Sequence, residues 1–292
     1  MRKLQLLICG ALLIGGVAAC SQQDIDASNT RFAENDQQIK TYATAKNLNG
    51  KTTNSGLYYV ITSPTTGKLP SLGEEVEFMY KSYNLQDVLI DSTVSGKPVY
   101  YPLGIQSILA GLEEGVGLMH EGEKATFLIP SYLGYGNNAV NANLPAYSVV
   151  RFDVQLNRSR TEDQQIRQYI ADRKLVVSDS SSTGVRVIKT KANPTGAALG
   201  ANQTVTIKYV GRQLRAAAPF DSTGQNFDAV LGGNRYVKGF EEGLSKLRVG
   251  ETATILFPST VGYGTTGVIS GNSYKITPYA PLRFDIQVIS VK

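Results

Sequence analysis

The reactive side chains of this chain are few, and their types exclude most covalent and metal-dependent chemistry. The 292 residues include one histidine, His120, and two cysteines, Cys9 and Cys20, which both lie near the N-terminus. A nucleophilic site needs a base within hydrogen-bond reach of its nucleophile, and a zinc site needs several Cys or His ligands. Neither set can be assembled, so we expect no metal centre and no bound cofactor.

Paired carboxylates and glycine triplets are the next candidates. Glu113-Glu114 and Glu241-Glu242 are neighbours in sequence, and adjacent residues on a helix do not face each other across a site. We interpret both pairs as exposed helix faces. The Gly-x-Gly triplets at 134–136 and 262–264 lack the strand-to-helix context of a phosphate loop. Neither feature therefore indicates acid–base catalysis or phosphate binding.

Residues 1–20 have the pattern of a bacterial export signal that ends at a lipid-modified cysteine. Arg2 and Lys3 precede an apolar run at 4–14, and small residues lead directly to Cys20. The run is too short for a permanent membrane-spanning helix. We predict a lipoprotein signal peptide at 1–19 and lipidation of Cys20. The alternative is an ordinary signal peptide beside a chance cysteine.

The mature chain would then be a lipid-anchored protein of the bacterial envelope. Ser21 after Cys20 favours sorting to the outer membrane, and the lipid would be the only contact with the membrane. Whether the protein faces the periplasm or the exterior stays open. With Cys9 removed, no internal disulfide can form, so packing alone must stabilise the fold.

The charge of the chain does not indicate a nucleic-acid partner. The formal net charge is +5, and Arg2 and Lys3 contribute two of these charges within the predicted signal. The remaining basic and acidic residues are mixed along the chain, without the basic patch that nucleic-acid binding requires.

One unit occurs twice in the sequence. Gly111-Leu112-Glu113-Glu114-Gly115 returns as Gly239-Phe240-Glu241-Glu242-Gly243, and Arg151-Phe152-Asp153 returns as Arg283-Phe284-Asp285. Gly134-Tyr135-Gly136 returns as Gly262-Tyr263-Gly264. The unit is too long for a solenoid repeat, so each copy is a domain.

Each unit contains a helical opening, several strands and one short amphipathic helix. Segments 31–48 and 160–175 lack Gly and Pro and predict the opening helices. Alternating apolar residues predict half-buried strands. An apolar stripe at Val237, Phe240, Leu244 and Leu247 predicts a helix that faces the sheet. We therefore predict an α+β fold with two tandem domains, each a curved antiparallel sheet wrapped around one short helix.

These patterns predict five segments along the chain. They are the signal peptide at 1–19, a tether and first helix at 20–50, a first domain at 51–158, a linker helix at 159–178 and a second domain at 179–292. The two opening helices are interpreted as spacers packed on their domains. Dimerising arms that form a cleft for client proteins are the alternative.

The second unit resembles the FKBP-type peptidyl-prolyl cis-trans isomerase family. The resemblance rests on Val205 to Gly211, Pro219-Phe220-Asp221, Val237-Lys238-Gly239-Phe240, Gly262-Tyr263-Gly264 and Leu282-Arg283-Phe284-Asp285, which follow the order of the family's landmarks. It implies a prolyl pocket made of Tyr209, Phe220, Asp221, Phe227, Tyr236, Val237, Phe240, Tyr263, Ile276 and Phe284. Phe240 stands where the family usually has Trp, and the Arg that commonly pairs with the pocket Asp is missing.

The first unit resembles the family less closely. The resemblance places Tyr80, Asp91, Ile108, Leu109, Leu112, Tyr135, Leu144 and Phe152 at its pocket positions. Ile90, Val99 and Leu112 replace aromatic residues of the family, which implies a shallower pocket and a weaker catalyst.

The resemblance implies a foldase that isomerises X-Pro bonds of exported proteins. In family terms, Tyr263 and the backbone N–H near Ile276 would bind peptide carbonyls, aromatic residues would wall the proline ring, and Asp221 would supply negative potential. The expected partners are proline-containing polypeptides, and the oligomeric state stays open. The alternative is a catalytically weak peptide-binding or chaperone module, or a subunit of a surface assembly, because fold does not guarantee activity.

Overall fold

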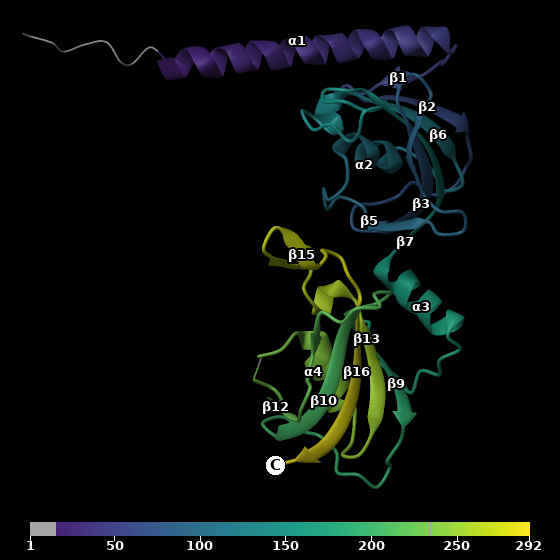
Figure 1. Cartoon of the computed structure of the whole chain (residues 1–292). Helices are drawn as coiled ribbons and strands as arrows, with labels where there is room; N and C mark the ends of the chain where they lie inside the picture. The colour runs from purple at the N-terminus through teal and green to yellow at the C-terminus, as the bar shows by residue number, and fades with distance from the viewer. Residues whose placement is uncertain (1–15, 234) are drawn as a thin grey trace, which may run out of the picture.

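The chain folds into two β-rich domains, each preceded by a helix (Figure 1). A computed structural model describes residues 16–233 and 235–292, with side chains described from residue 30 onward. The predicted signal peptide and the side chain of Cys20 lie outside the part whose side chains are described. Within the described residues, no helix is both long enough and apolar enough to cross a membrane.

The first domain is a seven-stranded antiparallel sheet with one short helix, α2 (Ala110–Gly117). The strand order is β1-β2-β6-β7-β3-β4, and β5 also pairs with β3. The strands are β1 (Lys51–Thr52), β2 (Tyr58–Ser63), β3 (Glu75–Tyr83), β4 (Leu89–Ser92), β5 (Val99–Pro102), β6 (Lys124–Ile129) and β7 (Val150–Arg160). A 3₁₀ turn, η1 (Ser131–Leu133), follows β6.

The second domain repeats this plan around α4 (Lys238–Ser245). Its main sheet has the order β11-β10-β16-β13-β9-β8, and β12 pairs with β10. The elements are β8 (Asp179–Ser180), β9 (Arg186–Lys191), β10 (Thr204–Gln213), β11 (Asp221–Ser222), β12 (Phe227–Val230), β13 (Thr252–Phe257), η2 (Ser259–Val261) and β16 (Leu282–Val291). A separate hairpin of β14 (Val268–Ser270) and β15 (Ser273–Ile276) projects beside η2. The predicted fold class is confirmed.

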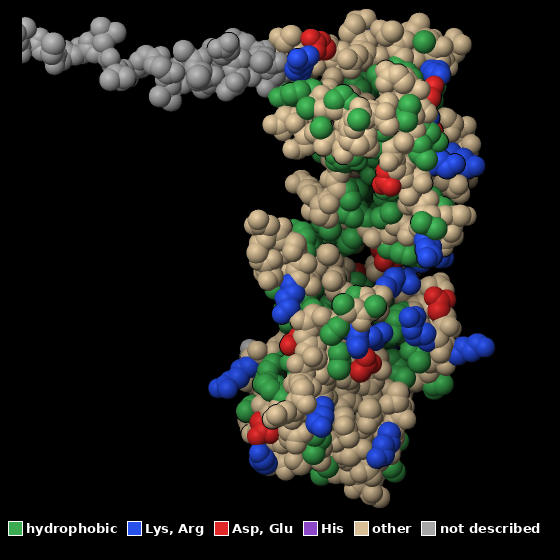
Figure 2. Space-filling view, viewed as in Figure 1, with side chains coloured by type: hydrophobic (Ala, Val, Ile, Leu, Met, Phe, Trp, Pro, Cys, Tyr) green, Lys and Arg blue, Asp and Glu red, His purple; other side chains and the backbone are tan. Residues whose placement is uncertain are grey.

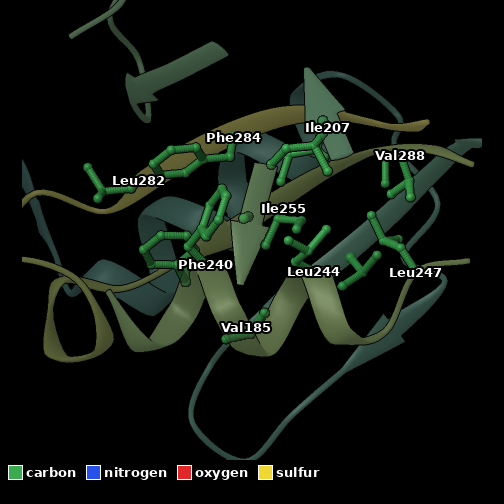
Figure 3. Close-up of a cluster of buried hydrophobic side chains, with 14 of the residues drawn as sticks. Val185, Ile207, Phe240, Leu244, Leu247, Ile255, Leu282, Phe284 and Val288 are labelled. Carbon is green, nitrogen blue, oxygen red and sulfur yellow. The ribbon is translucent and has the colours of Figure 1, made fainter. Parts of the chain in front are cut away.

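The core of the second domain lies between α4 and the concave face of the sheet (Figure 3). Phe240 and Leu244 of α4 are buried against strand side chains, as their helical spacing predicts. Gly239 and Gly243 lie on the same side of the helix. An ideal Cβ on Gly243 would lie 2.3 Å from Cγ2 of Ile255, so the helix rests directly on the sheet. The equivalent glycines of α2 approach the first sheet in the same way.

The two opening helices pack on their domains through equivalent residues. The first, α1 (Gly16–Ala45), begins earlier than the predicted segment, and its Ile39 and Tyr42 pack on the first sheet. The second, α3 (Glu162–Asp172), packs through Ile166 and Tyr169 on the second sheet. Both helices therefore pack on their own domains, as expected of spacers.

The carboxylates of the central helices are less exposed than the sequence indicated. Glu113 is buried, and its Oε1 accepts hydrogen bonds from the backbone N–H groups of Gly104 and Gln106. Glu242 accepts a hydrogen bond from Thr183 at 2.6 Å. The prediction of an exposed face was therefore wrong for Glu113, because its carboxylate satisfies a loop backbone that the sequence could not place beside it.

The two domains meet through an ion cluster and one inserted ring. Glu75 lies 3.0 Å from Arg160 and 3.5 Å from Arg215 of the second domain, and burial raises the pKa of its carboxyl. Both guanidinium groups lie over the ring of Tyr100. Tyr279 of the second domain packs against the first core. Figure 2 shows hydrophobic side chains gathered at this junction, with charges of both signs scattered over the face in view.

We predict that Gly243→Ala destabilises the second domain. Alanine favours a helix by about 1 kcal/mol, but the added methyl group must displace Ile255, which costs about 1–3 kcal/mol in a packed core. Chemical denaturation should show a lower free energy of unfolding. Gly117→Ala is the control, since its Cβ would lie 3.8 Å from Leu103, an ordinary contact. A Gly243→Ala protein as stable as the original would contradict the close approach of helix and sheet.

Candidate functional site

A cavity of about 190 Å³ opens beside the start of α4 in the second domain. Its wall is mostly aromatic, with one carboxylate, one guanidinium and three phenol groups. The lining residues are Tyr209, Asp221, Phe227, Arg235, Tyr236, Val237, Phe240, Tyr263 and Phe284. All of them except Arg235 were expected at the pocket from the sequence.

The sheet, the helix and one loop each contribute a wall. Tyr209 lies on β10 and Phe284 on β16, and these strands are paired. Val237 occupies the N-cap position of α4 and lines the cavity, and Phe240 lies about one turn further along the helix. Tyr263 follows η2 on a glycine-flanked loop. Residues distant in sequence therefore converge because the sheet curls around the helix.

The aromatic rings contact one another edge to face around the cavity. The ring centroid of Phe240 lies 5.0 Å from that of Phe284 and 5.7 Å from that of Tyr209. Phe227 and Tyr236 extend this set, with centroids 6.1 Å apart. Such contacts stabilise aromatic pairs beyond their buried area, and they hold each ring in one orientation. The result is a preformed apolar cage.

Asp221 is held by a tyrosine rather than an arginine. The hydroxyl of Tyr209 donates to Oδ2 of Asp221 at 2.7 Å. Burial and this bond raise the pKa of the Tyr209 phenol. Burial, and then the charge of Asp221, also raise the pKa of the Tyr263 phenol. Both hydroxyls therefore stay protonated at neutral and mildly alkaline pH, and Tyr263 can donate a hydrogen bond into the cavity.

Two of the expected residues, Phe220 and Ile276, are not among the residues that line the cavity. The ring of Phe220 lies 5.6 Å from that of Phe284 and 6.4 Å from that of Tyr263. Ile276 is buried in the core, on β15 opposite Val268 of β14. Phe220 therefore packs against two lining residues, whereas Ile276 belongs to the core of the domain.

Arg235 is a lining residue that was not expected from the sequence. It is exposed and directly precedes Tyr236 and Val237. Its only signal in the sequence is this adjacency to expected pocket residues. It places a positive charge on a cavity that otherwise carries the negative charge of Asp221.

The first domain has the same tyrosine–aspartate hydrogen bond as the second but lacks most of the aromatic rings of the cage. The hydroxyl of Tyr80 donates to Oδ2 of Asp91 at 2.6 Å, and burial raises the pKa of Tyr135. The ring of Phe152 lies 5.3 Å from that of Tyr80. The remaining expected positions are aliphatic: Ile108 and Leu109 are half-buried, whereas Leu112 and Leu144 are buried in the core.

No group of three or more Cys, His, Asp or Glu residues is placed to hold a metal ion within the described part of the chain. The cavity offers aromatic surface, hydroxyl donors and two opposite charges. This arrangement can enclose an apolar group and bind a neighbouring carbonyl, and it contains no nucleophile paired with a base.

Comparison with known proteins agrees with this geometry. A family model described as FKBP-type peptidyl-prolyl cis-trans isomerase matches residues 67–157 and 196–289, one segment in each domain. Peptidyl-prolyl cis-trans isomerase FKBP9 of Homo sapiens is 26% identical over 229 residues, which cover 77% of this chain and 36% of that protein. The isomerase FkpA of Aeromonas hydrophila is 36% identical over 126 residues, or 42% of this chain and 46% of that protein.

The chain thus spans less than half of the length of these two relatives. Among solved structures, FkpA from Escherichia coli is 24% identical with a TM-score of 0.38, and the match covers 51% of this chain and 74% of that one.

We predict that Asp221→Asn lowers the pKa of the Tyr263 phenol toward the free value of about 10. The carboxylate disfavours the phenolate, so its removal makes deprotonation easier. NMR titration of ¹³C-labelled tyrosine rings would measure the shift. Asp228→Asn is the control, because Asp228 bonds Thr206 and Lys292 instead of pocket residues. An unchanged Tyr263 pKa in Asp221→Asn would contradict this electrostatic coupling.

Proposed function

The chain belongs to the FKBP-type peptidyl-prolyl cis-trans isomerase family, and from that premise we propose that it isomerises X-Pro peptide bonds, chiefly in its second domain. The observation that carries this proposal is the aromatic cavity of the second domain, with the Tyr263 hydroxyl at its wall. The substrates would be proline-containing polypeptides, and no cofactor is needed.

The reaction requires rotation about a bond with partial double-bond character, and its barrier is about 20 kcal/mol. Uncatalysed exchange takes tens of seconds or more. A catalyst must bind the twisted amide more tightly than either planar form. No covalent bond needs to form or break, which fits a site without a nucleophile.

Three features of the site would favour the twisted amide. Phe240, Phe284 and Tyr209 would enclose the proline ring and exclude water from the planar, more dipolar ground state. The Tyr263 hydroxyl would donate to a peptide carbonyl, and the backbone near Ile276 would provide a second donor. Asp221, oriented by Tyr209, would place negative potential beside the rotating carbonyl. Preorganised donors of this kind need no rearrangement during the reaction.

The first domain would be the weaker catalyst. It retains the Tyr80–Asp91 hydrogen bond and the half-buried Tyr135. However, Leu112 stands where the second domain has Phe240, and Ile108 stands where it has Tyr236. Aliphatic side chains give a less rigid and less polarisable wall for a proline ring, so we assign this domain a secondary or peptide-binding role.

We further propose that the protein works in a bacterial envelope, held by a lipid on Cys20, on proteins that have been exported. The support is the leader pattern before Cys20 and the similarity to FkpA proteins of bacteria.

In a bacterial host, Cys20→Ser should move the protein from the membrane fraction to the soluble fraction, because the acyl chains supply the membrane affinity. Unchanged membrane association would reject the lipid anchor. Ser21→Ala is the control for a change beside the cleavage site.

We predict that Tyr263→Phe lowers kcat/KM for Leu-Pro or Phe-Pro peptides about five- to tenfold, the equivalent of one hydrogen bond. A protease-free exchange assay on the full chain would measure the rates. Tyr135→Phe is the matched change in the first domain, and it should preserve most of the rate enhancement. A larger loss in Tyr135→Phe would reverse the assignment of the domains. A full chain that binds proline peptides but does not accelerate exchange would reject the isomerase proposal in favour of a binding module.

A further inference from the structure

In each unit a short turn, η1 or η2, leads into a loop that carries a tyrosine between two glycines, at 134–136 and 262–264. We call these segments the tyrosine loops. The opening helix of each unit contacts the turn before its tyrosine loop. In the second unit, Oε2 of Glu162 accepts a hydrogen bond from the backbone N–H of Ser259 at 2.5 Å. Its Oε1 accepts another from Oγ of Ser259 at 2.6 Å. In the first unit, Oδ1 of Asn35 accepts a hydrogen bond from the backbone N–H of Ser131 at 2.7 Å. The same contact therefore occurs in both copies, made by different side chains.

Ser259 fixes the tyrosine loop through its backbone carbonyl. Its carbonyl accepts hydrogen bonds from the backbone N–H groups of Gly262 and Gly264, both at 2.8 Å. These two glycines flank Tyr263. A displacement of Ser259 would therefore move both ends of the segment that carries the Tyr263 hydroxyl.

The helix that carries Glu162 is itself a fixed support. Thr161 and Gln164 form a capping box, which sets the start of α3 beside Glu162. Ile166 and Tyr169 anchor the helix on the outer face of the second sheet. The hydroxyl of Tyr169 accepts a hydrogen bond from Arg283, a neighbour of Phe284 in the cavity wall.

The other end of the loop is bonded by Tyr279, whose ring contacts the first domain. The backbone N–H of Tyr279 donates to the carbonyl of Gly264 at 3.0 Å. The ring of Tyr279 packs on Gly73, where an added Cβ would lie 2.6 Å from the ring. The tyrosine loop is thus clamped between α3 and a residue that inserts into the first domain.

The two copies differ in how completely the contact is made. Glu162 satisfies both the N–H and the hydroxyl of Ser259. Asn35 accepts from the N–H of Ser131 and donates to the carbonyl of Tyr147 at 3.0 Å, and the buried Oγ of Ser131 has no hydrogen-bond partner among the described residues. The serine of the turn is therefore fully bonded by the helix in the domain with the aromatic cavity. A role as a spacer alone would not require a carboxylate aimed at this turn.

We propose that Glu162 is a positioning residue for Tyr263, so that the linker helix holds the tyrosine loop of the second domain in its substrate-binding geometry. This inference rests on the proposed isomerase function for its kinetic consequence. Its geometric part, a loop held by the helix, can be measured separately.

The test compares Glu162→Ala, Glu162→Gln and Asp163→Asn in the full chain. Glu162→Ala should lower kcat/KM for proline peptides about tenfold, since small misplacements of a binding group reduce rates strongly. Glu162→Gln should restore most of the rate, because its amide can still accept from the N–H of Ser259. Asp163→Asn is the matched control: it removes a neighbouring charge that pairs with Arg167 and Arg186 and leaves the Ser259 bonds intact.

NMR of the same proteins separates this inference from the proposed function. In Glu162→Ala, the amide signals of residues 259–264 and the ring signals of Tyr263 should shift, whereas they should stay in place in Asp163→Asn. An active full chain whose Glu162→Ala variant has unchanged rates and unchanged loop signals would overturn the inference alone. An inactive full chain would reject the isomerase function, and the loop shifts would still decide whether Glu162 positions Tyr263.

Discussion

The direct contact between the central helix and the sheet is the constraint from which the site of the second domain follows. Gly239 and Gly243 allow α4 to rest on the side chains of Phe257 and Ile255. At this distance Phe240 extends along the sheet and reaches Phe284, instead of pointing into solvent. The helix start, with Tyr236 and Val237, then forms part of the cavity wall. A larger residue at either glycine would separate helix and sheet and would open the cage.

The two domains show which parts of the site are independent of one another. The hydroxyl–carboxylate pair is present in both, as Tyr80–Asp91 and Tyr209–Asp221. The aromatic cage is complete in one copy only. Because the sheet–helix contact and the polar pair survive without the cage, they belong to the architecture of the fold. The rings of Phe227, Tyr236 and Phe240 are what distinguish the aromatic cavity of the second domain from the equivalent region of the first.

The environment of the site extends beyond the domain that contains it. The turn before the second tyrosine loop contacts α3 through Glu162, and Tyr279 links the loop to the first domain. The ion cluster of Glu75, Arg160 and Arg215 lies at the same junction. Glu75 and Arg160 both lie in the first domain, so Arg215 is the member of this cluster that crosses the junction. This ion pair and the ring of Tyr279 both join the second domain to the first.

The sequence alone determined the repeat, the fold class and most of the cavity wall. Periodicity identifies the strands and the central helices because burial of apolar side chains follows the period of each element. The position of Tyr263 between glycines and the order of the landmarks then located the pocket. Only the tertiary structure decided which hydroxyl orients Asp221, that Phe220 and Ile276 are not among the lining residues, that Glu113 is buried, and that Arg235 lines the cavity. These facts depend on contacts between different elements of the fold, such as the hydrogen bond from Tyr209 to Asp221, and no local pattern encodes the partner of such a bond.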